Sequence, residues 1–115
     1  MEEISVETDT GSFEAFFADN FLRHFLGMRF RSEGKMLFKF HRKSRPRIDM
    51  LFVPKTLYLY FLDSDKKVID VQKAEPWSWN PRTWRFYRPK VKSEYLLESF
   101  RPMDLEEGEK LDWKT

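Results

Sequence analysis

Alternating apolar and polar positions divide the chain into short segments separated by polar turns. KMLFKF at residues 35–40 alternates apolar side chains at its even positions with mainly polar ones at its odd positions, the period of two expected of a half-buried strand. LYLYFLD at residues 57–63 and KVIDVQK at residues 67–73 flank a short polar turn. They predict a β-hairpin in which Val68 and Asp70 share one face.

The segment SFEAFFADNFLRHFLGMRFR, residues 12–31, fits two patterns. A single helix would gather its phenylalanines into one stripe, but Asn20 and His24 would lie near the centre of that stripe. A buried polar group without a partner costs about 1–3 kcal/mol. The alternative is a strand over residues 12–17 and then a short helix that ends at Gly27. We favour the alternative because it buries no unpaired polar group.

Two further segments complete the predicted elements. SEYLLESF at residues 93–100 predicts a later strand, and LDW at residues 111–113 predicts a short terminal one. The elements together predict a mainly β fold, a compact antiparallel β-sandwich or barrel-like domain with one short helix near residues 20–27.

The length of 115 residues is that of one domain, and no repeat or Pro/Gly/Ser-rich linker divides the chain. We therefore expect residues 1–115 to form a single domain with its core over about residues 13–100. The acidic segment 1–11 and the segment 101–115 are expected to be peripheral.

Composition limits the kinds of site that the chain can form and indicates its cellular compartment. The absence of cysteine excludes disulfides, thiolate zinc sites and cysteine nucleophiles. The longest apolar run, LYLYFL, is far shorter than the roughly 20 residues that cross a bilayer, and the acidic N-terminus does not fit a secretory signal. We expect a cytoplasmic protein. The charged fraction of 35%, rich in Lys, Arg and Glu, is a thermophile-like composition.

Charge is distributed unevenly along the chain. Of 21 bases and 19 acids, residues 1–20 hold six acids and no base, and residues 100–115 hold five acids and three bases. The 79 residues between them therefore carry 18 bases and eight acids. Such asymmetry is typical of a nucleic-acid footprint, and it also fits acidic ends that fold back over a basic middle.

The densest aromatic cluster lies inside this basic middle. PWSWNPRTWRFYRPK at residues 76–90 holds three tryptophans, a Phe and a Tyr together with four bases and no acid. HRKSRPR at residues 41–47 forms a second basic segment, a turn by composition. Rings of this kind can fill the core of a small β domain, or they can stack under unpaired bases while the cations bind phosphates.

The order of several segments resembles the domain-of-unknown-function 192 family, also called uncharacterised protein family 0127. The resemblance rests on ADNFLRHFLGMRFR at 18–31, KMLFKF, IDMLF at 48–52, LYLYFLD followed by KVI, and WRFYRPK with EYLLES over 84–99. It implies a compact, mainly β domain with a short helix in the N-terminal third, and it implies no established activity. The chain departs from the family pattern at Asp49, where the family has His, and at Val53, where it has Met.

No catalytic or metal-binding motif stands out. The two histidines, His24 and His41, are far apart in sequence, and the chain has no HExxH, GxSxG or phosphate-binding glycine pattern. Asp63 and Asp65 at the hairpin turn are explained by side chains that bond nearby backbone amides. We expect no cofactor and no metal site.

The sequence favours a non-catalytic binding or interaction module for a small ligand or a protein partner, with no membrane association. We predict a site where residues 77–88 pass residues 48–52, and its six residues are Trp77, Trp79, Trp84, Arg85, Arg88 and Asp49. One alternative is single-stranded nucleic-acid binding through the stretch 77–92, and another is an enzyme with an unrecognised carboxylate site around Asp49 or Asp63. Within the stretch, Trp84, Phe86 and Tyr87 are expected to serve mainly as core or corner residues.

Overall fold

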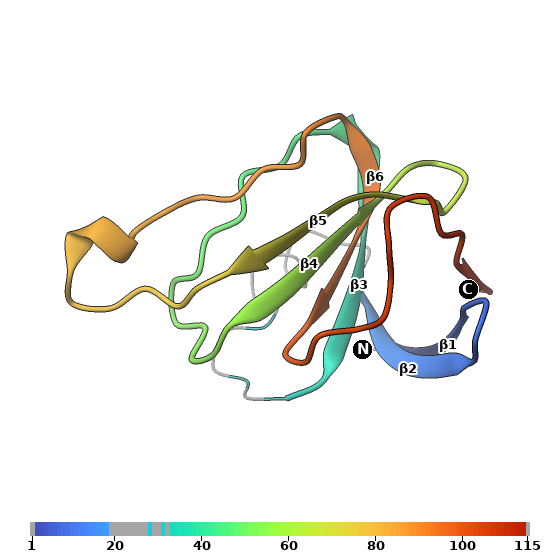
Figure 1. Ribbon diagram of the computed structural model, residues 1–115, viewed down its shortest axis with the longest axis horizontal. Coiled ribbons are helices and arrows are strands. Elements are labelled where there is room, and N and C mark those ends of the chain that lie inside the picture. Colours follow the sequence, from blue (N-terminus) through green and yellow to red (C-terminus); the bar gives the residue numbers. More distant parts are fainter. Residues whose placement is uncertain (1, 19–27, 29–30, 32, 115) are drawn as a thin grey trace.

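The computed structural model describes residues 2–18, 28, 31 and 33–114. Within them the chain forms seven strands and one short 3-10 helix: β1 (Glu2–Glu7), β2 (Ser12–Ala18), β3 (Lys35–Ser44), β4 (Leu57–Leu62), β5 (Val68–Ala74), η1 (Pro81–Thr83), β6 (Ser93–Ser99) and β7 (Asp112–Trp113). All seven strands belong to one curled sheet in the order β5-β4-β6-β3-β2-β1-β7 (Figure 1). The predicted mainly β fold is confirmed.

The predicted elements are largely present. The β4–β5 hairpin, β3, β6, β7 and the strand that opens the 12–31 segment all form close to their predicted places. The short helix predicted near residues 20–27 lies outside the described residues. β1 was not predicted, although Ile4 and Val6 alternate with acidic and polar residues in the two-residue period of a strand.

One strand pair departs from the predicted antiparallel sheet. β2 and β3 are parallel, with Phe16 opposite Met36 and Ala18 opposite Phe38, while the other neighbouring pairs are antiparallel. Parallel neighbours need a connection of about a dozen residues or more, because the chain has to return to the same end of the sheet. Residues 19–34 provide that length between the two strands.

Buried side chains form one cluster on each face of the sheet. The first core cluster consists of Ile4, Val6, Ala15, Phe17, Leu37, Tyr60, Leu62, Val68, Leu97, Leu105, Leu111 and Trp113. The second core cluster consists of Ala18, Met28, Met36, Phe38, Met50, Val53, Leu57, Leu59, Phe61, Ala74 and Leu96. Neighbours along β4 and β6 enter opposite clusters, as the alternation of a strand requires.

β3 keeps the predicted half-buried pattern except at Leu37. Met36 and Phe38 are buried in the second core cluster, whereas on the other face Leu37 is buried in the first and Lys39 is exposed.

The acidic terminal segments contribute to the first core cluster. β1 pairs with β7, with Val6 opposite Trp113, so the two ends of the chain lie side by side at one edge of the sheet. The C-terminal acids also reach the basic middle. The carboxylate of Asp112 lies 3.3 Å from the ammonium of Lys66, and that of Glu107 lies 3.4 Å from the ammonium of Lys90.

A bulge in the hairpin changes the predicted facing of β5. Leu62 pairs with Val68, but Phe61 pairs with Asp70, so one extra residue is inserted on β5. Val68 packs in the first core cluster, whereas Asp70 stands opposite a residue of the second. The predicted common face for Val68 and Asp70 is therefore wrong.

Candidate functional site

The connection between β5 and β6, residues 75–92, leaves the sheet and carries η1 at its far end (Figure 1). We call it the projection. Residues of the tip itself cap η1. The Oδ1 atom of Asn80 accepts a hydrogen bond from the amide of Arg82 at 3.1 Å, and Pro81 at the first helical position has no N–H that would need a partner. The Oγ1 of Thr83 accepts from the amide of Ser78 at 2.8 Å and donates to the carbonyl of Asn80 at 2.7 Å.

Two tryptophans hold the arms of the projection together. The indole N–H of Trp77 donates to the carbonyl of Arg85 at 2.9 Å, and that of Trp84 donates to the carbonyl of Ser78 at 2.8 Å. The Trp77 ring also meets Phe86 edge to face, with centroids 5.4 Å apart. Trp77 and Trp84 thus hold the two arms of the projection together, and Trp77 also packs against the second core cluster.

Trp79 differs from the other two tryptophans of the projection. Its side chain is 98% exposed, whereas Trp77 is half-buried. Trp84 and Phe86 are also open to solvent, 52% and 48% exposed, in contrast to the core or corner role expected for them. Tyr87 is half-buried and packs against the second core cluster, as expected.

The base of the projection is bonded to the end of β3 and to the chain after it. Residues 41–44 of the basic segment belong to β3, so the turn predicted for residues 41–47 is wrong for this part. Ile48 and Tyr87 exchange two backbone hydrogen bonds of 2.8 and 2.9 Å, and Ser44 pairs with Ser93. Between these pairs the guanidinium Nε of Arg45 donates to the carbonyl of Pro89 at 2.8 Å, so the two basic segments meet at the base of the projection.

The segment 41–47 and the projection are both rich in cations. Apart from His41, their bases are Arg42, Lys43, Arg45, Arg47, Arg82, Arg85, Arg88, Lys90 and Lys92. Arg47 lies over the ring of Phe86, with 4.2 Å between its guanidinium carbon and the ring centroid. Among the described residues, Lys90 is the only one of these nine within ion-pair distance of a carboxylate. The positive charge of this surface is largely uncompensated.

Asp49 has a local structural contact beside this surface. It follows Ile48, so the predicted meeting of residues 48–52 with residues 77–88 occurs at the Ile48–Tyr87 pair. The Oδ1 of Asp49 accepts a hydrogen bond from the amide of Leu51 at 3.0 Å. This bond shapes the turn after Ile48.

The other carboxylates singled out from the sequence also have local bonds. The Oδ1 of Asp63 accepts from the amides of Asp65 and Lys67 at 2.9 and 3.0 Å, which closes the hairpin turn. Asp70 is buried, and its Oδ2 accepts from the side chain of Gln72 at 2.8 Å and from the amide of Lys90 at 3.0 Å. In the described part of the chain, no three His, Cys, Asp or Glu side chains gather as a metal site would require.

Sequence reasoning missed a second basic feature of the surface. A hollow of about 620 Å³ is lined by Phe16, Arg31, Glu33, Gly34, Lys35, Lys55, Ser99, Phe100 and Arg101. Arg31 and Lys35 are four residues apart, but Lys55 and Arg101 come from distant parts of the chain. Pairing of β3 with β6 brings the first and last of these segments together, so no local pattern could have revealed the hollow.

The chain belongs to the DUF192 family, described as uncharacterized ACR, whose profile matches residues 4–113. It is 32% identical to a UPF0127 protein of Pyrococcus furiosus over 107 residues, which covers 87% of this chain and 86% of the relative. A UPF0127 protein of Pyrococcus abyssi is 31% identical over 105 residues, with 85% and 84% covered. The family resemblance noted in the sequence is thereby confirmed.

Two solved structures share the fold. A Sinorhizobium meliloti protein described as "a putative transcription regulator" superposes with a TM-score of 0.80 at 18% identity, over 96% of this chain and 92% of that one. A protein of unknown function from Novosphingobium aromaticivorans gives a TM-score of 0.77 at 16% identity, over 96% and 84% of the two chains. In the described residues of this chain, no helix is long and apolar enough to cross a membrane.

Proposed function

We propose that the protein is a non-catalytic binding module and that its partner is single-stranded nucleic acid, bound along the projection and the basic segment beside it. One observation carries the proposal. The Ile48–Tyr87 pair joins the two basic segments, Arg47 of the first lies over the exposed ring of Phe86 in the second, and the projection also carries the exposed rings of Trp79 and Trp84.

The charge of this surface favours an anionic partner over a neutral one. No acid lies in residues 76–90, and none of Arg47, Arg82, Arg85 and Arg88 forms an ion pair within the described residues. Among the residues that the structure describes, the C-terminal acids form ion pairs with Lys66 and Lys90 only. A polyanion would gain affinity here by releasing its counterions as its phosphates meet these cations.

The exposed rings favour unpaired bases over a phosphate surface alone. A tryptophan that is 98% exposed contributes almost nothing to folding, because its ring stays in water. Each base stacked on such a ring contributes about 1–3 kcal/mol to binding. In a duplex the bases are stacked on one another and are not available, so the partner is single-stranded.

Hydrogen bonds of the candidate residues make a small-ligand site and an enzyme less favoured alternatives. A small-ligand site around Trp77 is less favoured because the indole N–H of Trp77 is used inside the projection. An enzyme would need a carboxyl poised for proton transfer, whereas Asp49 and Asp63 each accept amides of their own turns. The description of the Sinorhizobium meliloti protein adds no weight, since 18% identity supports the fold alone.

Binding of a fluorescently labelled oligothymidylate, followed by anisotropy, tests the proposal. We expect saturable binding that a duplex of the same length competes for poorly. Trp79→Ala should weaken the affinity between about fivefold and 100-fold, in line with one lost stacked base. The matched control is Val71→Ala, which truncates another exposed apolar side chain, on β5, and should leave the affinity unchanged.

Two outcomes would reject nucleic-acid binding by the projection. One is the absence of saturable binding to any single-stranded oligonucleotide near physiological salt. The other is binding that Trp79→Ala and Val71→Ala reduce equally. If the wild-type protein instead bound an acidic polypeptide through Trp79 and no oligonucleotide, the binding module would remain and its partner would be a protein.

A further inference from the structure

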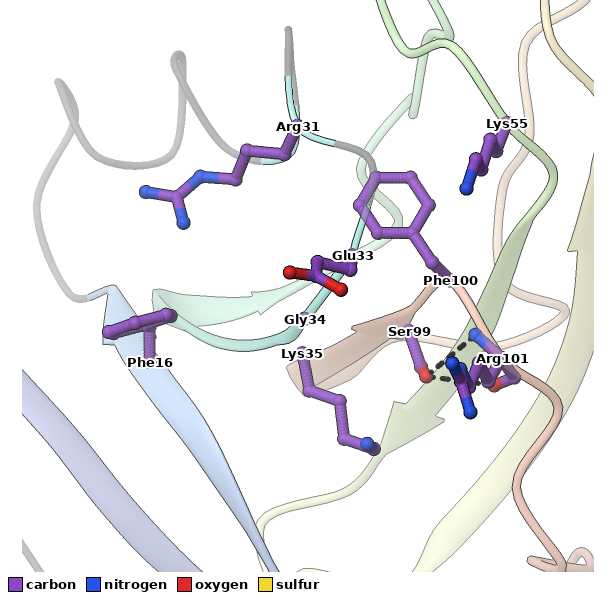
Figure 2. A pocket seen from close by; sticks show the side chains of 9 residues that line it. All are labelled: Phe16, Arg31, Glu33, Gly34, Lys35, Lys55, Ser99, Phe100 and Arg101. Atoms are coloured by element: carbon purple, nitrogen blue, oxygen red, sulfur yellow. Dashed lines mark hydrogen bonds between the residues drawn. The ribbon is translucent and has the colours of Figure 1, made fainter.

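The hollow lined by four cations lies at the end of the sheet where β3 begins and β6 ends. Figure 2 shows that its lining residues come from separate segments, namely β2, the chain before β3 and its first residue, the chain before β4, and the end of β6 with the turn after it. The projection rejoins the sheet at the opposite end of the same strands, where Ser44 pairs with Ser93. The hollow is therefore a separate feature from the proposed nucleic-acid surface.

Strand pairing, a glycine with positive φ and a hydrogen-bonded turn shape the hollow. Lys35 at the start of β3 pairs with Ser99 at the end of β6. Gly34 has a φ of +109°, a conformation that side chains other than glycine disfavour, and its carbonyl accepts from the amide of Phe100 at 3.5 Å. The hydroxyl of Ser99 accepts from the amide of Arg101 at 3.1 Å and donates to its carbonyl at 2.8 Å, which fixes the turn.

The charge in the hollow is one-sided. Among the lining residues, Arg31, Lys55 and Arg101 are accompanied by a single carboxylate, that of Glu33, while the ammonium of Lys35 lies 5.9 Å from the ring centroid of Phe13, outside the lining. Within the described part of the chain, none of these cations lies within ion-pair distance of a carboxylate. Like charges that line one hollow repel one another, and an anion that enters it relieves this repulsion.

Aromatic surface accompanies the cations. Arg31 lies over the ring of Phe16, with 5.3 Å between its guanidinium carbon and the ring centroid, which orients its planar fork. The half-buried ring of Phe100 stands between Arg31 and Lys55 in Figure 2. A ligand in the hollow would thus meet a flat apolar surface as well as donors. Its volume of about 620 Å³ falls in the usual range for small-molecule sites, roughly 300–1,000 Å³.

We propose that this hollow binds a phosphorylated small molecule of about nucleotide size. Its phosphates would accept hydrogen bonds from Arg31, Lys55 and Arg101, since guanidinium forks and ammonium groups are the donors that proteins use for phosphate. A group with several negative charges fits better than a single carboxylate, because Arg31, Lys55 and Arg101 outnumber the one acid of the lining. A flat ring on the ligand would pack against Phe100.

Isothermal titration calorimetry with three probes tests the phosphate requirement. Pyrophosphate and adenosine triphosphate are expected to bind saturably, and adenosine, which has no phosphate, is not. Tighter binding of the triphosphate than of pyrophosphate would add the ring contact to the phosphate contacts. Equal binding of adenosine and the triphosphate would overturn the proposal, as would the absence of binding by both phosphate probes.

Three variants assign the binding to the hollow. Lys55→Gln combined with Arg101→Gln changes two exposed side chains and should weaken pyrophosphate binding about tenfold or more. Lys67→Gln combined with Lys110→Gln removes the same charge from two exposed positions outside the hollow, and we expect little change. Glu33→Gln removes the acid of the lining and should tighten binding about twofold to threefold.

The Lys55/Arg101 variant should weaken pyrophosphate binding and Glu33→Gln should tighten it, and these opposite effects on affinity make the test specific. Equal weakening by the two double variants would show a general charge effect and overturn the proposal. Trp79→Ala should bind pyrophosphate as the wild type does, and the Lys55/Arg101 variant should still bind oligothymidylate. These two results separate the hollow from the projection, so one proposal can fail while the other stands.

Discussion

Ile48 and Tyr87 exchange two backbone hydrogen bonds of 2.8 and 2.9 Å, and this pair joins the base of the projection to the segment that follows β3. Tyr87 also uses its side chain, because its hydroxyl accepts from the amide of Glu75 at the start of the projection at 3.1 Å. One residue thus connects both arms of the projection with Ile48, the residue that follows the basic segment 41–47. These bonds fix the base of the projection beside that segment.

Removal of the Tyr87 hydroxyl should loosen the projection at a modest cost. We expect Tyr87→Phe to lower the free energy of unfolding by about 0.5–1.5 kcal/mol, the usual contribution of one hydrogen bond. Urea denaturation measures the change. Tyr58→Phe is the matched control, because that half-buried hydroxyl forms no hydrogen bond within the described residues. Equal losses in the two variants would contradict this role for Tyr87.

The hydroxyl of Tyr60 anchors the C-terminal segment to the sheet. It accepts a hydrogen bond from the amide of Met103 at 2.8 Å and donates one to the carbonyl of Met103 at 3.1 Å. Tyr60 is only 2% exposed. Tyr60→Phe leaves a backbone donor and acceptor without this partner, so we expect a loss of about 1–3 kcal/mol in urea denaturation. A change below that of Tyr58→Phe would contradict the anchoring role.

Tyr60 should also make the stability of the protein depend on pH in the alkaline range. Burial raises the pKa of Tyr60 above its ordinary value of 10.0, so the folded protein holds this proton more tightly than the unfolded chain does. Its contribution to stability is full below pH 10 and decreases as the pH rises from there through the folded pKa. Stability measured on both sides of pH 10 should therefore decrease less in Tyr60→Phe than in the wild type. Parallel curves would contradict the prediction.

Gly34 is expected to be sensitive to substitution for a backbone reason. Its φ of +109° is strained for alanine, although a Cβ atom there would meet nothing within 4 Å. We expect Gly34→Ala to cost about 1–3 kcal/mol in urea denaturation. Gly11→Ala is the control, since a Cβ atom there also has open space and no positive φ is required. That change should be neutral or stabilise by about 0.4–1 kcal/mol.

Asp70 should tolerate the loss of its charge poorly. It is 1% exposed, its Oδ2 accepts from Gln72 and from the amide of Lys90, and its Oδ1 lies 3.7 Å from the ammonium of Lys90. Asp70→Asn places an N–H₂ group among these donors and should cost about 1–3 kcal/mol. Asp65→Asn changes an exposed turn residue instead and should stay within about 0.5 kcal/mol of the wild type. Similar losses in both variants would count against the buried network.

The strands could be predicted from the sequence because their patterns are local. The β4–β5 hairpin follows from two apolar runs around a polar turn, and β3 follows from the period of KMLFKF. The pattern did not show that Leu37 is buried in the first core cluster, because its coverage depends on distant segments. Nor did it show the bulge that turns Asp70 away from the face of Val68, since one inserted residue leaves the composition unchanged.

The candidate site was predictable in part. The sequence located the aromatic and basic residues and the meeting of residues 48–52 with residues 77–88. It did not separate Trp77, whose indole N–H bonds within the projection, from Trp79, which is 98% exposed, because both stand beside polar residues in one short stretch. The hollow depends on pairing between Lys35 and Ser99, which lie far apart in the chain.

The most direct test of the proposed function is the salt dependence of oligothymidylate binding. We compare the wild type with a variant that carries Arg82→Gln, Arg85→Gln and Arg88→Gln, three exposed changes that remove no carboxylate partner in the described residues. For single strands each phosphate contact contributes about 0.7 to the slope of log K against log salt concentration. We therefore expect a steep negative slope in the wild type that is shallower by about 2 in the variant. Identical slopes, or wild-type binding that is indifferent to salt, would contradict nucleic-acid binding by the projection.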